Sequence, residues 1–184
     1  MVASVKHTLV ALVEDKPGVL NRAASLFRRR GFNIESIAVG HSEIAGLSRM
    51  TLVVDGANTV VEQVEKQLYK LVDVVKVTDI TSESMVAREL ALIKVGATTA
   101  TRSEILQIVD IFRANIVDVA SDSVMVEVTG DENKIDSLLD LLKSFGIKEL
   151  VRTGRVAMVR GTDSGSPIDE ESVQKIKKRR KKQG

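Results

Sequence analysis

The chain has 184 residues, 43% of them hydrophobic and 28% charged, which is typical of one or two folded domains and excludes bulk disorder. It contains no cysteine and only two histidines, so disulfides and thiol chemistry are excluded, and neither a metal site nor histidine-based catalysis is expected. No apolar run approaches the roughly 20 residues that span a bilayer. Residues 1–6 also lack the apolar core of a signal peptide, so we expect a cytoplasmic protein with no membrane partner.

The net charge of +2 conceals an uneven distribution of charge along the chain. Seven of the 27 basic residues lie in Lys175–Lys182, which holds no acid, and the rest of the chain carries five more acidic than basic side chains. Residues 162–184 are poor in apolar side chains and begin with a Gly/Ser/Pro-containing stretch. We therefore predict a disordered basic tail attached to an acidic folded body.

The first 80 residues show strand and helix patterns in the order β-α-β-β-α-β. Residues 6–14 are β-rich and contain an unbroken apolar run at 9–13, which predicts a strand buried on both faces, and residues 15–18 follow with turn chemistry. An amphipathic helix is predicted over residues 19–30, ending at Gly31. Its apolar face is expected to consist of Leu20, Ala23, Ala24 and Phe27. Further strands are predicted over 34–40, 48–55 and 72–80, and a second helix over 59–71.

After a polar linker at residues 81–87, the same order of patterns begins again. Strands are predicted over 89–95, 116–120, 124–129, 147–152 and 156–160, and helices over 103–113 and 131–145. The local match of Phe27 and Asn33–Ile34 to Phe112 and Asn115–Ile116 indicates an internal repeat. The predicted fold class is α+β, with two ferredoxin-like βαββαβ domains at residues 1–80 and 88–161.

The sequence contains few of the residue patterns that catalysis or nucleic-acid recognition requires. It has no glycine-rich phosphate loop, and its acidic residues fall on predicted exposed helix faces, where solvated charge is the ordinary role. RNA-binding modules of this fold stack bases on aromatic side chains of the sheet. All five aromatic residues fall in predicted helices or just after one, so we do not expect a nucleic-acid partner.

The most informative segment is the junction of the first strand and first helix, residues 14–20. A helix N-terminus offers unpaired N–H groups and a positive dipole end, which attract a carboxylate, and Gly18 lets a ligand approach the backbone. Asp15 could accept hydrogen bonds from an ammonium group or cap the helix. Local chemistry thus fits either an amino-acid site or a simple capped helix after a Pro-Gly turn.

The pattern D-x-P-G-V-L after a first strand resembles the ACT domain, a regulatory module that binds amino acids at subunit interfaces. More narrowly, the blocks FRRRGFNIESI, LSRMT and VEKQLYKLVDVV resemble the small regulatory subunit of acetohydroxyacid synthase, also called acetolactate synthase. The resemblance continues through IFRANIVDV to TGRVAMVRG and covers residues 6–161, leaving out the basic tail.

This resemblance implies a regulator whose partner carries out the chemistry. In this family a large catalytic subunit binds thiamine diphosphate, FAD and magnesium, and this chain would hold no cofactor, metal or catalytic residue. The small subunit raises the activity of that partner and confers feedback inhibition by valine. Two alternatives stay open: a free-standing amino-acid sensor acting on another partner, and a nucleic-acid binder acting through Lys175–Lys182.

The resemblance also places an effector site between the N-terminal ACT domains of a homodimer. The expected effector-binding residues are Asp15, Pro17, Gly18, Val19 and Leu20 of one subunit and Asn33 and Ile34 of the other. Backbone N–H groups of residues 18–20 would hold the ligand carboxylate, and Asp15, where many family members carry Asn, would pair with its ammonium group. Taken locally, Asn33 fits a turn residue with positive φ, and the apolar members of this set fit core packing.

Overall fold

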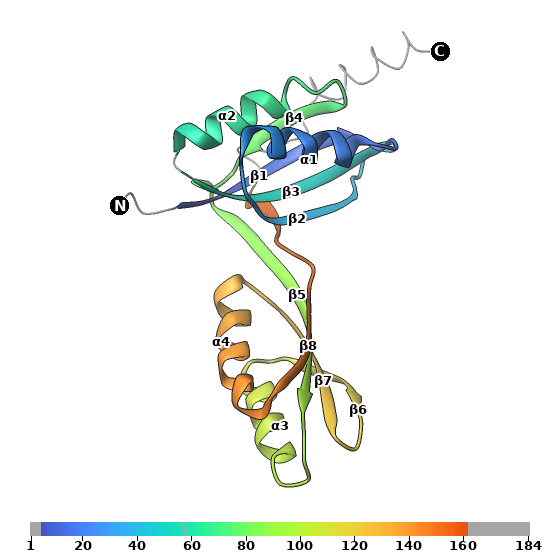
Figure 1. The fold of residues 1–184 in the computed structure, drawn as a ribbon, viewed down its shortest axis with the longest axis vertical. Helices are drawn as coiled ribbons and strands as arrows, with labels where there is room; N and C mark the ends of the chain where they lie inside the picture. The colour runs from blue at the N-terminus through green and yellow to red at the C-terminus, as the bar shows by residue number, and fades with distance from the viewer. Residues whose placement is uncertain (1–4, 57, 162–184) are drawn as a thin grey trace. The chain divides into compact units, whose positions relative to one another are not determined.

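The structure is a computed structural model that describes residues 5–56 and 58–161 (Figure 1). The tail expected at residues 162–184 lies outside the described residues. The chain forms two compact units, the first made by residues up to Val86 together with those from Ala157 onward, and the second by Ala87–Val156.

The first unit is a four-stranded antiparallel sheet with two helices on one face (Figure 1). Its elements are β1 (Val5–Glu14), α1 (Val19–Arg30), β2 (Ile34–His41), β3 (Leu47–Gly56), α2 (Asn58–Leu68) and β4 (Val74–Asp79). The strand order is β2-β3-β1-β4, which confirms the ferredoxin-like arrangement predicted from the patterns.

Strand β1 lies at the centre of this sheet and is buried on both faces, as its unbroken apolar run predicts. Leu9, Ala11 and Val13 belong to the core between sheet and helices. Val10 and Leu12 alternate with them and are also fully buried. Because side chains alternate between faces along a strand, such a run can be satisfied only where both faces are covered.

The helical phase of α1 differs from the prediction. Its buried side chains are those of Val19, Ala23, Leu26 and Phe27. Leu20 is 50% exposed and Ala24 is also exposed, so the expected apolar face was wrong at these two positions. Both stripes satisfy the i, i+3, i+4 spacing, but only the observed one buries Leu26, which removes more apolar surface from water than Ala24 would.

Helix α1 ends at Gly31, as predicted, and the reason is visible in the backbone. Gly31 has φ 69° and ψ 22°, a left-handed conformation that glycine adopts without steric cost. Its N–H and that of Phe32 donate to the last carbonyls of the helix, those of Arg28 and Phe27. The rings of Phe27 and Phe32 then pack edge to face, with centroids 6.4 Å apart.

The second unit repeats this plan. Its elements are β5 (Met85–Gly96), α3 (Arg102–Ile111), β6 (Asn115–Val119), β7 (Ser123–Gly130), α4 (Glu132–Leu142), the 3₁₀ turn η1 (Lys143–Phe145) and β8 (Ile147–Arg152). The last strand, β9 (Val156–Val159), belongs to the first unit from Ala157 onward. The order β6-β7-β5-β8 matches that of the first sheet, with β9 pairing to β5. Strand β5 begins at Met85 rather than at Glu89, so its first residues are those expected to form a polar linker.

The core of the second unit contains the predicted helix positions. Ile135, Leu138, Leu139 and Leu142 of α4 are buried, as are Ile105 and Val109 of α3. Arg113 follows α3 with φ 49° and is the non-glycine residue with positive φ in the described chain. Its N–H and that of Ala114 donate to the carbonyls of Asp110 and Val109, the same pattern that Gly31 and Phe32 make at the end of α1.

The helical phase of α1 predicts unequal effects of two leucine truncations. Leu26→Ala should lower the free energy of unfolding by about 2–5 kcal/mol, because it leaves a cavity at a side chain that is 5% exposed. Leu20→Ala should change it by less than about 1 kcal/mol. Urea unfolding of both variants measures the difference, and equal losses would contradict the observed phase.

Candidate functional site

The turn between β1 and α1 is shaped by Pro17 and Gly18. Gly18 has φ 84° and ψ −6°, and the Val19 N–H donates to the Lys16 carbonyl at 3.4 Å. These are the features of a type II turn, which favours proline at its second position and needs a positive φ at its third. The sequence Lys-Pro-Gly-Val therefore sets the direction in which α1 leaves the sheet.

Helix α1 starts without a side-chain cap. Its N-cap residue is Gly18, which has no side chain to offer, and the first turn holds no acidic residue. Asp15 does not cap the helix, so that interpretation of its role was wrong. Its carboxylate instead lies 3.2 Å from Nδ1 of His41 at the end of β2, and 44% of the side chain is exposed.

Donor groups without acceptors are left at this end of α1. The Arg22 N–H donates to the Gly18 carbonyl at 3.0 Å, and the Val19 N–H is held in the turn. Within the described chain no acceptor pairs with the backbone N–H of Leu20 or Asn21. Such N–H groups carry the positive end of the helix dipole and bind carboxylates or phosphates. Of the three N–H groups expected to hold a ligand, that of Val19 is therefore already engaged.

The N-termini of the two helices in the second unit differ from that of α1. The Thr98 and Thr101 hydroxyls accept hydrogen bonds from each other's backbone N–H before α3, at 3.2 and 3.0 Å. Asp131 caps α4 by accepting from the Lys134 N–H at 2.8 Å. Each helix also has an acidic residue in its first turn. Of these two helices α4 has a side-chain cap, whereas α3 begins without one, as α1 does, and differs from α1 in the acidic residue of its first turn.

Two polar residues near this turn were not anticipated from the sequence. Arg22, one turn into α1, donates from Nε to Oδ2 of Asp73 at 2.6 Å. Asp73 precedes β4, is 7% exposed, and its backbone carbonyl accepts from the Glu14 N–H at 2.8 Å. The sequence does indicate that Arg22 lies near the turn. Arg22 follows Gly18 by four positions, and side chains on a helix lean toward its N-terminus.

The remaining expected residues lie apart from this turn within one chain. Asn33 is exposed just beyond α1, so a helix of 12 residues, roughly 18 Å long, separates it from Gly18. It does not have a positive φ, so the interpretation as a left-handed turn residue was wrong. Ile34 packs against the first core. Val19 is buried there too, which leaves Leu20 as the exposed apolar side chain of the turn.

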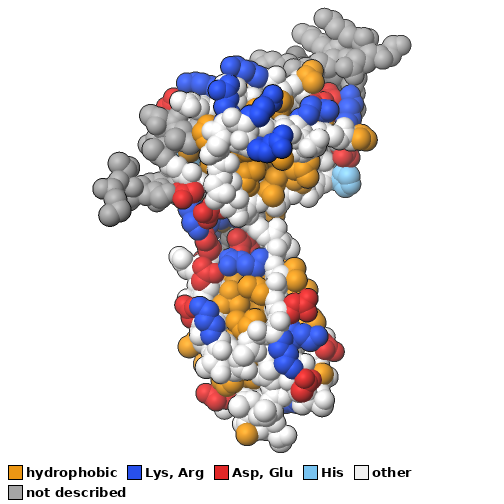
Figure 2. All heavy atoms as spheres, viewed as in Figure 1, with side chains coloured by type: hydrophobic (Ala, Val, Ile, Leu, Met, Phe, Trp, Pro, Cys, Tyr) orange, Lys and Arg blue, Asp and Glu red, His pale blue; other side chains and the backbone are white. Residues whose placement is uncertain are grey.

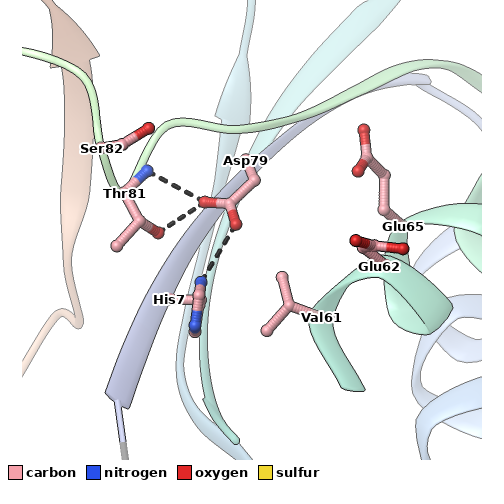
Figure 3. A pocket seen from close by; sticks show the side chains of 7 residues that line it. All are labelled: His7, Val61, Glu62, Glu65, Asp79, Thr81 and Ser82. Atoms are coloured by element: carbon pink, nitrogen blue, oxygen red, sulfur yellow. Dashed lines mark hydrogen bonds and ion pairs between the residues drawn. The ribbon is translucent and has the colours of Figure 1, made fainter. Parts of the chain in front are cut away.

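A second polar site lies at the other end of β1. A cavity of about 350 Å³ is lined by His7, Val61, Glu62, Glu65, Asp79, Thr81 and Ser82 (Figure 3). The Asp79 carboxylate accepts from the Thr81 backbone N–H at 2.9 Å and lies 3.0 Å from His7 Nδ1. Partial burial raises the pKa of Glu65, and repulsion by Asp79 and Glu62 adds to this effect.

The described residues contain no group of three or more His, Cys, Asp or Glu side chains placed to hold a metal ion. None of the helices in the described ranges is long and apolar enough to cross a membrane. None of the five aromatic residues lies on a strand, as predicted, so neither sheet presents aromatic rings for base stacking. Basic side chains gather instead over the helical side of the first unit (Figure 2), where Arg28, Arg29 and Arg30 occupy the last turn of α1.

Comparison with known proteins identifies relatives of both units. Residues 9–76 match a family model described as an AHAS small subunit-like ACT domain, and residues 88–161 match one described as the small subunit of acetolactate synthase. The chain is 60% identical over 157 residues to the probable acetolactate synthase small subunit of Archaeoglobus fulgidus, covering 85% of this chain and 98% of that protein. It is 55% identical over 160 residues to the acetolactate synthase small subunit of Bacillus subtilis, covering 86% and 92%.

A solved structure agrees with these sequence matches. The crystal structure of the acetolactate synthase small subunit from Thermotoga maritima superposes with a TM-score of 0.80 at 46% identity. The match covers 86% of this chain and 99% of that one.

The raised pKa of Glu65 in this cavity predicts that removing its charge changes the stability of the protein in a pH-dependent way. A carboxyl group whose pKa is higher in the folded state than in the unfolded state lowers the free energy of unfolding at a pH above the folded-state pKa. At a pH below the unfolded-state pKa, about 4.3 for Glu, it has no such effect. Glu65→Gln should therefore raise the melting temperature at pH 7, and the gain should shrink as the pH falls toward 4.

Thermal melts across this pH range measure the effect, with Glu149→Gln, an exposed position in the second unit, as the control. A melting temperature lowered by Glu65→Gln at pH 7, or a gain that does not change with pH, would contradict this account of the cavity.

Proposed function

We propose that this chain, which belongs to the family of acetolactate synthase small subunits, activates a large catalytic subunit and makes it sensitive to inhibition by valine. A small subunit implies a catalytic large-subunit partner, and the proposal assigns thiamine diphosphate, FAD and magnesium to that partner. A cytoplasmic location belongs to the same proposal, since a chain without cysteine needs no oxidising compartment. The observation that carries the effector assignment is the uncapped start of α1, where backbone donors point outward without acceptors.

The proposed effector site joins two copies of the first unit. The turn Asp15–Leu20 of one copy would meet Asn33–Ile34 of a second, because one chain holds these segments at opposite ends of α1. The ligand carboxylate would lie on the N–H groups of Leu20 and Asn21, and the exposed carboxylate of Asp15 would accept from its ammonium group. Leu20 and Ile34 offer apolar surface to a branched side chain.

Valine would then act by stabilising one arrangement of the paired units. A ligand bound across two copies adds its binding free energy only to the arrangement in which both halves of the site meet. The catalytic partner would respond because its own contacts differ between the two arrangements, which is the condition for allosteric coupling. The second unit, whose two helices each carry an acidic residue in the first turn, would serve assembly rather than effector binding.

Substitution of Gly18 separates activation from inhibition. Gly18→Asp puts a carboxylate at the start of α1, where that of the ligand would lie, and should abolish valine inhibition while leaving activation of the catalytic subunit. The left-handed backbone costs a non-glycine residue roughly 1–2 kcal/mol, which a folded domain tolerates. The measurement is acetolactate synthesis by the reconstituted complex against valine concentration.

Gly161→Asp is the matched control, because Gly161 also has a positive φ, 77°, and open space around it. This variant should be inhibited as the wild type is. Normal valine inhibition of Gly18→Asp would show that the effector binds elsewhere, and failure of the wild-type chain to raise the activity of its partner would overturn the regulatory role itself.

A further inference from the structure

The Arg22 guanidinium lies directly beside the start of α1. A Cβ built on Gly18 would be 3.2 Å from Nη1 of Arg22 and 3.9 Å from its Cζ. The side chain of Arg22 therefore reaches back over the glycine, and a larger residue at position 18 would press against it. Glycine is favoured here by the positive φ of the turn, and it also leaves room for the guanidinium beside it.

A cation at this position is unusual, because the N-terminus of a helix already carries partial positive charge. The ion pair with Asp73 accounts for the placement of Arg22 but uses only Nε. Within the described chain no acceptor pairs with Nη1 or Nη2, although the side chain is only about half exposed, 46%. The free Nη groups and the free N–H groups of Leu20 and Asn21 form one set of donors that together lack an anion.

Asp73 fixes where these free donors lie. Its carboxylate is 9% exposed, and its backbone carbonyl holds the end of β1 through the Glu14 N–H. A planar guanidinium held at Nε presents its Nη groups in a fixed direction. Asp73 thereby holds Arg22 against the turn instead of leaving a mobile side chain in solvent.

We propose that Arg22 binds the carboxylate of the amino-acid effector and that Asp73 is the residue that positions it. This inference rests on the effector site proposed above and makes that site specific for ligands that carry a carboxylate. A charge-assisted hydrogen bond from Arg22 would add to those from the backbone, and an amine or amide of the same shape would lose it. Asp73, in turn, links the end of β1 and the start of β4 to the occupancy of the site.

The test compares valine with valinamide, in which a neutral amide replaces the carboxylate, by calorimetric titration of the full chain. The wild type should bind valine more tightly than valinamide. Arg22→Gln should weaken valine binding about tenfold or more while changing valinamide binding little, since only the charged partner is lost. Arg22→Lys should recover part of the preference, and Asp73→Asn should reduce it with Arg22 still in place.

Arg88→Gln is the control, because Arg88 is an exposed arginine of the second unit and belongs to neither segment of the proposed site. It should leave both affinities unchanged. A valine-to-valinamide preference in Arg22→Gln equal to that of the wild type would overturn the role of Arg22, with the effector site itself intact. If the wild type binds no valine, the proposed effector site and the proposed role of Arg22 are both contradicted. Circular dichroism establishes that each variant is folded, and loss of stability alone would not change the ratio of the two affinities.

Discussion

The start of α1 depends on a backbone conformation that only a few residues can adopt. Gly18 holds a positive φ, so the chain turns sharply out of β1 and the helix begins with no side chain over its first N–H groups. The buried Asp73 completes the arrangement by binding the end of β1 with its carbonyl and Arg22 with its carboxylate. Two strands and one helix thus meet at a point where backbone N–H groups of α1 and the Nη groups of Arg22 are left without acceptors in the described chain.

The two units show how one fold can carry different chemistry. Both have four antiparallel strands in the same order with two helices beside them. In the second unit, Asp131 caps α4 and Glu104 lies in the first turn of α3. In the first unit the first turn of α1 has neither a side-chain cap nor an acidic residue. The proposed effector site therefore depends on the few residues at the turn, while the fold follows from the apolar pattern that both units share.

Most of the fold could be predicted because its signals are local and repeated. The unbroken apolar run of β1, the glycine that ends α1 and the evenly spaced leucines of α4 each predict one structure only. The phase of α1 was wrong at Leu20 and Ala24 because two apolar stripes satisfy the same spacing, and only packing against the sheet selects one. The early start of β5 was missed because its first residues directly follow the polar stretch at residues 81–84, and the pairing of β5 with β9 joins segments far apart in the sequence.

The candidate site was harder to predict because its geometry joins distant parts of the chain. The role of Gly18 followed from the Pro-Gly turn, but the capping role suggested for Asp15 was wrong, since the type II turn leaves Gly18 as the N-cap. The contact of Arg22 with Asp73 spans 51 positions, and no local pattern indicates it. Pairing of the turn with Asn33 and Ile34 of a second copy came from the family resemblance and stays a prediction.

The central claim is that an amino acid binds the free donors at the start of α1. Two-dimensional ¹H–¹⁵N NMR of the full chain, titrated with valine, observes these groups directly. The account predicts that the amide resonances of Gly18, Leu20 and Asn21 shift most, because a carboxylate placed on an N–H changes its electronic environment strongly. Unchanged resonances at these three positions, with valine-dependent shifts confined to other parts of the chain such as the His7–Asp79 cavity, would contradict it.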